Sequence, residues 1–137
     1  MWNCKSMSSP MKTNLHKLKE ATTESPSIDS TLYKQMIGSL MYLVNTRLDI
    51  CYVVNTLSQF MCEPKEIHLV AVKHIMRYLQ GTLNFGLKYE KVDLYLHGLT
   101  DLDLGGSIKD KKSTSRCCFS LGSTMISWIC RKQSLVA

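Results

Sequence analysis

The hydrophobic period of this 137-residue chain changes once, near residue 82. Before that point apolar residues recur at the spacing of one helical face, and after it they alternate with polar or small residues. Side chains repeat every 3.6 residues on a helix but every two on a strand, so the change separates two structural units. The sequence therefore predicts an α+β fold, with helices over residues 31–82 and an antiparallel sheet over residues 83–137.

Three amphipathic helices are predicted in the first unit. The first spans about residues 32–44, with apolar side chains at positions i, i+3, i+4 and i+7. The second begins near Asp49, whose carboxylate suits the positive end of a helix dipole. Pro64 is expected as the first residue of the third helix, and Gly81 ends it. With such short connections, the three helices should pack on one another.

The second unit contains period-two segments that predict strands. Gly122 and Ser123 should form a tight hairpin turn between the last two strands. The predicted strands cover residues 85–89, residues 94–106, residues 117–121 and residues 125–129.

Residues 1–30 differ from both units because they are polar and contain Pro10 and Pro26. They show no apolar periodicity that would dock them against a core, which predicts a flexible linker or extension. No apolar run of signal-peptide length occurs near the N-terminus, and Arg47 and Asp49 interrupt the longest apolar region. We therefore expect no membrane span or membrane partner, and an intracellular location in the cytoplasm or nucleus. The six cysteines lack metal-knuckle spacing and are expected to be free thiols.

Basic residues are concentrated in the last quarter of the chain. Residues 104–137 contain six basic residues and one acidic residue, so +5 of the net charge of +6 lies there. This distribution favours a polyanionic partner such as nucleic acid, and a solvated surface is the alternative. Lys73 and Arg77 stand four residues apart on one helix face, where either a phosphate-facing surface or solvated charge explains them. The candidate nucleic-acid-binding residues are Lys73, Arg77, Lys109, Lys111, Lys112 and Arg116.

Two carboxylates, Asp101 and Asp103, precede the pair Gly105-Gly106. On a strand they point to one face, where they repel each other unless a bend separates them or a cation neutralises them. Oxygen ligands suit Mg²⁺ or Mn²⁺, although two ligands do not fill an octahedral shell. The plainer alternative is a strand end that enters a turn. No nucleophile elbow, Walker loop or dinucleotide fingerprint occurs, which removes most support for hydrolase, kinase and dehydrogenase classes.

Ten short stretches follow one another along the chain. They are YKQMIGSLMYL at residues 33–43, TRLDI at 46–50, LSQFM at 57–61, KHIMRYLQGT at 73–82, FGLKY at 85–89, DLDLGG at 101–106, KSTS at 112–115, CFSLG at 118–122, ISW at 126–128 and RKQ at 131–133. Together and in this order they resemble one family, the Pol polyproteins of copia-type LTR retrotransposons, at the junction of reverse transcriptase and ribonuclease H. The resemblance covers nearly the whole chain.

The resemblance implies a role for each unit. Residues 31–82 would form part of the reverse transcriptase thumb and connection region, and residues 83–137 the N-terminal part of an incomplete RNase H-like domain. Asp101 would be the catalytic, first metal-binding carboxylate, with Asp103 as a second candidate ligand and Mg²⁺ or Mn²⁺ as the family's cofactor. The partner would be an RNA:DNA hybrid, recognised through its backbone and the RNA 2′-hydroxyl groups.

Some residues depart from the family pattern. Where the family has an aromatic, a small residue and a Trp, this chain has Leu99, Leu102 and Leu104, and Leu48 replaces a Pro. Arg116 replaces a Gly after the Ser-Thr-Ser turn, where a side chain can strain the backbone.

The chain ends before the family's Ser-Ser-Thr-Glu-Ala-Glu-Tyr helix, which carries the next catalytic carboxylate. We therefore expect a truncated, catalytically incomplete piece that binds no metal stably and retains some binding of hybrids or other nucleic acids. One alternative is a ribonuclease H whose missing carboxylates come from another chain, and a second is an unexpressed or purely structural relic. An open sheet edge is expected to favour self-association.

Overall fold

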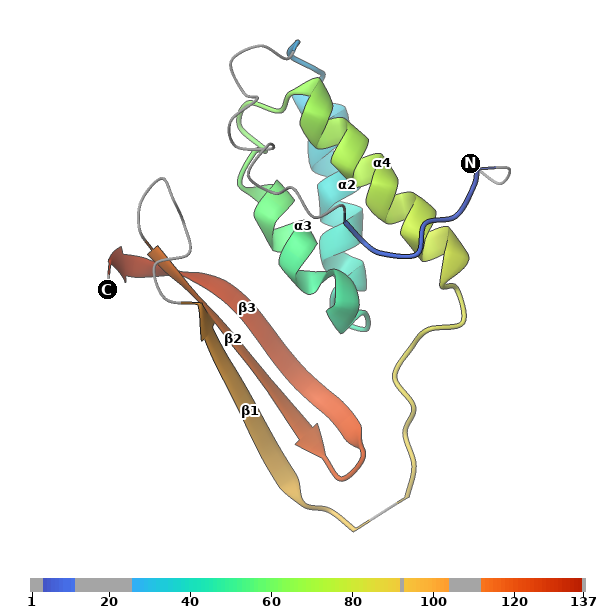
Figure 1. Ribbon diagram of the computed structural model, residues 1–137, viewed down its shortest axis with the longest axis vertical. Coiled ribbons are helices and arrows are strands. Elements are labelled where there is room, and N and C mark those ends of the chain that lie inside the picture. Colours follow the sequence, from blue (N-terminus) through green and yellow to red (C-terminus); the bar gives the residue numbers. More distant parts are fainter. Residues whose placement is uncertain (1–3, 12–25, 92, 104–111, 137) are drawn as a thin grey trace. The chain divides into compact units, whose positions relative to one another are not determined.

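The computed structural model describes residues 4–11, 26–91, 93–103 and 112–136. The chain divides into two compact units, which we call the helical unit (Met1–Phe85) and the sheet unit (Gly86–Ala137). Helices followed by an antiparallel sheet confirm the predicted α+β class (Figure 1). The elements are α2 (Ser30–Leu43), the 3₁₀ turn η1 (Leu48–Ile50), α3 (Cys51–Ser58), α4 (Glu66–Gly81), β1 (Leu96–Asp103), β2 (Lys112–Leu121) and β3 (Thr124–Val136).

Helix α2 matches the first predicted helix within two residues at each end. It begins at Ser30 because the Asp29 side chain accepts a hydrogen bond from the backbone N–H of Thr31, at 2.8 Å. Such a cap satisfies one of the backbone donors that a helix start leaves unpaired. The second predicted helix also exists, but its first turn is η1, which leads directly into α3.

Helix α4 ends at Gly81 as predicted, but it begins at Glu66, two residues after Pro64. The prediction that Pro64 is its first residue is therefore wrong. Lys65 is the N-cap, and its backbone N–H donates to Nδ1 of His68 at 3.1 Å. The Pro64 carbonyl instead accepts a hydrogen bond from Ile28 at 3.3 Å, so Pro64 belongs to a contact between separate chain segments.

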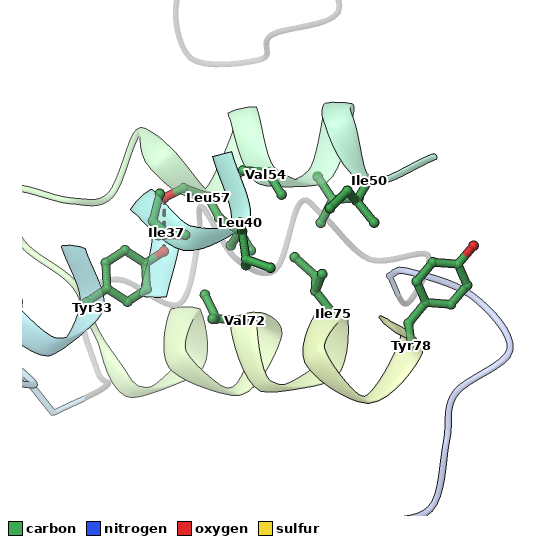
Figure 2. Close-up of a cluster of buried hydrophobic side chains, with 10 residues drawn as sticks. Tyr33, Ile37, Leu40, Ile50, Val54, Leu57, Val72, Ile75 and Tyr78 are labelled. Atoms are coloured by element: carbon green, nitrogen blue, oxygen red, sulfur yellow. Dashed lines mark hydrogen bonds between the residues drawn. The ribbon is translucent and has the colours of Figure 1, made fainter. Parts of the chain in front are cut away.

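The three helices pack around one apolar core, as expected from their stripes (Figure 2). The core includes a buried hydrogen bond, because the Tyr33 hydroxyl donates to the Leu57 carbonyl at 2.9 Å. Burial raises the pKa of the Tyr33 phenol, which therefore stays a neutral donor. The buried side chains are Tyr33, Ile37 and Leu40 from α2, Ile50, Val53, Val54 and Leu57 from η1 and α3, and Val72, Ile75 and Tyr78 from α4.

Two N-terminal segments of the helical unit also contact its helices. Met7 donates a backbone hydrogen bond to the Arg77 carbonyl at 3.4 Å, and Met7 and Met11 pack against the core. Ser27 forms an isolated antiparallel bridge with Lys65. The expectation that residues 1–30 lack contacts with a core is thus wrong for residues 4–11 and 26–29. Isolated apolar side chains, namely Met7, Met11 and Ile28, and backbone hydrogen bonds make these contacts, and neither leaves a periodic pattern. Residues 1–3 and 12–25 lie outside the described part of the chain.

The sheet has the order β1-β2-β3, and both neighbouring pairs are antiparallel. The predicted hairpin at Gly122-Ser123 is confirmed, with Leu121 opposite Thr124 and Gly122 at a positive φ of 60°. Glycine adopts this left-handed conformation without the strain that a Cβ atom would add. The Gly122 backbone N–H donates to the Tyr95 carbonyl at 2.8 Å.

The predicted strand at residues 85–89 is wrong, because the structure assigns no strand to those residues. Alternation alone does not make a strand, since the backbone also needs a neighbouring strand for its hydrogen bonds. Phe85 and Tyr89 are instead exposed. The Lys88 carbonyl accepts a hydrogen bond from the Thr124 hydroxyl at 2.8 Å, which is a side-chain contact and not part of a ladder.

Candidate functional site

Lys73 and Arg77 lie one helical turn apart on α4, on the face that the sequence predicted. Lys73 is exposed, and Arg77 is partly buried. The Arg77 Nε donates to the Lys5 carbonyl at 2.7 Å, which holds one edge of the guanidinium against the N-terminal segment. The other edge carries Nη donors, the groups that bind phosphate oxygens.

The N-terminal segment adds a basic residue that the sequence reasoning missed. His74 Nε2 lies 3.0 Å from the Ser9 carbonyl, so His74 and Arg77 both hold residues 4–11 against α4. Exposed Lys5 is thereby brought to the same helix. We call Lys5, Lys73 and Arg77 the α4 basic cluster. No sequence pattern could reveal Lys5 as a member, because 68 residues separate it from Lys73.

A second polar group, centred on Arg47, was also missed. Arg47 is 8% exposed, and its Nε and Nη2 donate to the two carboxylate oxygens of Asp49 at 3.0 and 2.8 Å. Its Nη1 and Nη2 also donate to the Thr82 carbonyl and hydroxyl at 3.0 and 2.7 Å. The guanidinium therefore joins the start of α3 to the end of α4. These four hydrogen bonds within the protein give Arg47 a structural role.

Tyr78 and Phe85 complete the surroundings of Arg47. The Tyr78 hydroxyl donates to Asp49 Oδ2 at 2.7 Å, and the Arg47 guanidinium carbon lies 5.8 Å from the Tyr78 ring centre and 5.6 Å from that of Phe85. Partial burial opposes ionisation of Asp49, but the hydrogen bonds from Arg47 and Tyr78 outweigh it and hold the Asp49 pKa below its ordinary value. The hydrogen bond to Asp49 raises the pKa of Arg47.

Asp101, the predicted catalytic carboxylate, lies on β1 opposite Arg116 on β2. The Arg116 Nη1 is 3.1 Å from Asp101 Oδ2, and 66% of the Asp101 side chain is exposed. The structure thus pairs a predicted metal ligand with a predicted nucleic-acid ligand. Lys112 is the first residue of β2. The side chain of Asp103, and Lys109 and Lys111 entirely, lie outside the described residues.

The described residues do not fit a divalent metal ion. Over the described ranges, no group of three His, Cys, Asp or Glu side chains is placed to hold one. Mg²⁺ and Mn²⁺ require several oxygen ligands, whereas the ion-pair partner of Asp101 in the described residues is the guanidinium of Arg116. All six cysteines are free, as expected. In the part of the chain that the structure describes, no helix has the length and apolar character needed to cross a membrane.

The chain is similar to three retrovirus-related Pol polyproteins from plant transposons. It is 48% identical to that of transposon RE1 from Arabidopsis thaliana over 106 residues, which are 77% of this chain and 7% of that protein. It is 39% identical to that of RE2 from the same plant, over 97% of this chain and 9% of that protein. It is 36% identical to that of TNT 1-94 from Nicotiana tabacum, over 100% of this chain and 11% of that protein.

No family model matches the chain, and no solved structure matches it. The chain thus spans between 7% and 11% of the length of these three relatives. Their similarity extends over most of this chain and includes both the helical and the sheet unit. The chain belongs to the retrovirus-related Pol polyproteins of copia-type transposons, and it corresponds to a segment of them.

Proposed function

We propose that the helical unit is part of the thumb and connection region of a reverse transcriptase, and that its α4 basic cluster binds the phosphate backbone of an RNA:DNA hybrid. The observation that carries this proposal is the placement of Lys73 and Arg77 one turn apart on α4, with the backbone of Lys5 held at Arg77. Membership of the Pol family supports a nucleic-acid partner.

The chemistry of the cluster suits backbone contact. Lysine binds phosphate as a mobile point charge, whereas the Arg77 guanidinium is oriented by its bond to the Lys5 carbonyl. Contacts of this kind position a protein on a duplex but carry no base information. Such binding serves a protein that must hold a hybrid of any sequence, and it should weaken as salt rises because counterions are released.

We propose that the sheet unit is the N-terminal part of an RNase H-like domain. We further propose that its described residues bind nucleic acid and do not hydrolyse it. Hydrolysis at Asp101 in the family manner would use Mg²⁺ or Mn²⁺. The Asp101–Arg116 ion pair gives that reaction no support here. The proposal for α4 does not depend on this assignment.

Hybrid binding can be tested with one matched pair of variants. Anisotropy of a fluorescent RNA:DNA hybrid, measured from about 50 to 200 mM salt, gives the affinity and its salt slope for each protein. Lys73→Gln should weaken binding and reduce the slope by about one. Lys34→Gln, which removes an exposed charge from α2, should leave the slope close to that of the unchanged chain. Equal effects of the two substitutions, or binding that does not depend on salt, would contradict the proposal.

A further inference from the structure

The pairing of Asp101 with Arg116 suggests a property that is independent of the proposed function of α4. We propose that Arg116 is a built-in counter-cation which keeps divalent metal ions from binding at the Asp101 carboxylate. Arg116 then acts against metal binding, and Asp101 serves as half of a cross-strand ion pair.

The register of the sheet places the two groups together. Asp101 and Arg116 are direct partners within a continuous set of antiparallel pairs that runs from Leu96↔Leu121 to Asp103↔Thr114. Direct cross-strand partners project from the same face of a sheet. This register therefore places the Arg116 guanidinium beside the Asp101 carboxylate. The guanidinium donates to Asp101 Oδ2 at 3.1 Å.

The guanidinium opposes a metal ion in two ways. It already engages an oxygen that the metal would need, and its positive charge repels a second cation at the same place. Arginine keeps this charge at every pH that a folded protein experiences, so a change of pH does not remove the effect.

The size of the effect follows from solvent exposure. The side chains of Arg116 and Asp101 are 41% and 66% exposed, so water and salt screen the pair. Exposed ion pairs contribute modestly, and the expected change in metal affinity is about two- to fivefold. The described residues include no set of three ligands that would bind a metal without Asp101.

The test is a Mn²⁺ titration of the full ¹⁵N-labelled chain, followed by paramagnetic broadening of the backbone amides of Thr100, Asp101 and Leu102. Arg116→Gln should show this broadening at about two- to fivefold lower Mn²⁺ concentration than the unchanged chain. Arg131→Gln is the matched control, because it removes one exposed positive charge from β3. It should change the required concentration less than Arg116→Gln does.

Adding Asp101→Asn to Arg116→Gln should abolish the gained broadening, which shows that the carboxylate is the ligand. The proposal is overturned if Arg116→Gln titrates like the unchanged chain, or if Arg131→Gln has an equal effect, since net charge would then explain it. If the Arg116→Gln amides lose their dispersion, Arg116→Thr replaces it, because threonine has a high strand propensity. The same shift is expected, and its absence counts equally against the proposal.

Discussion

The helical unit and the sheet unit use their apolar residues differently. In the helical unit, large side chains such as Ile37 and Val54 are 0% exposed, whereas in the sheet unit Leu96 and Leu99 are 67% and 70% exposed. The sheet is held by its backbone ladder and hairpin, while the helices are held by a common core. Regular secondary structure thus forms in both units, but among the described residues the larger stabilisation from apolar burial falls to the helical unit.

The largest expected effect compares one leucine from each unit. Leu57→Ala removes a fully buried side chain and leaves a cavity, which should cost about 3 kcal/mol of unfolding free energy. Leu99→Ala, at an exposed position, should change the stability of the sheet by less than about 0.5 kcal/mol. Urea unfolding followed at 222 nm reports the first, and amide hydrogen exchange in β1 and β2 reports the second. Similar losses of stability from the two substitutions would show that the two units do not differ in how much they depend on apolar burial.

The Arg47 group tests whether polar contacts also stabilise the helical unit. Arg47→Met should cost about 2 kcal/mol, because it removes the cationic partner of the Asp49 carboxylate and one donor to the Thr82 carbonyl. The Tyr78 hydroxyl and the Phe85 N–H remain as donors to these two groups. Lys34→Met, at an exposed position on α2, is the matched loss of a charge and should be nearly neutral. The same urea unfolding measurement distinguishes them, and equal midpoints would exclude a structural role for Arg47.

The hairpin tests the source of stability in the sheet unit. Gly122→Ala places a Cβ atom at a φ of 60°, which should cost about 1 kcal/mol. Amide exchange across the β2–β3 ladder should then become about fivefold faster if exchange follows opening of the hairpin. Gly38→Ala is a useful control in α2, because a Cβ there meets nothing within 4 Å. It should be neutral or slightly stabilising.

The smallest expected effect is a dependence of stability on pH. The folded-state pKa of Asp49 lies below its unfolded value of 3.8, so its stabilising contribution is complete well above pH 4. The contribution is lost as the pH falls through the lower, folded-state pKa. A third of the Asp49 side chain is exposed, so the change should be modest. Urea midpoints between pH 6 and pH 3 should fall less steeply in Asp49→Asn than in the unchanged chain.

Periodicity correctly predicted the elements that depend on local spacing and on local hydrogen bonds. The stripe of α2 and the hairpin turn at Gly122 are examples, because spacing and turn chemistry are local properties. The same reasoning was wrong at Pro64, whose carbonyl contacts Ile28, and at residues 85–89, which pair with no strand among the residues that the structure describes. Of the candidate site, the shared face of Lys73 and Arg77 was predictable, and Lys5 was not.

The amino-acid sequence was enough to predict the family, the change from helices to sheet, and the faces that the helices bury. Ordered motifs carry the first of these, and local spacing carries the other two. The sequence was not enough to predict that Arg47 joins Asp49 to Thr82, that residues 4–11 lie on α4, or that Arg116 stands beside Asp101. These contacts depend on strand register and helix packing. Both are set by burial and hydrogen bonding summed over many residues, and no local spacing records them.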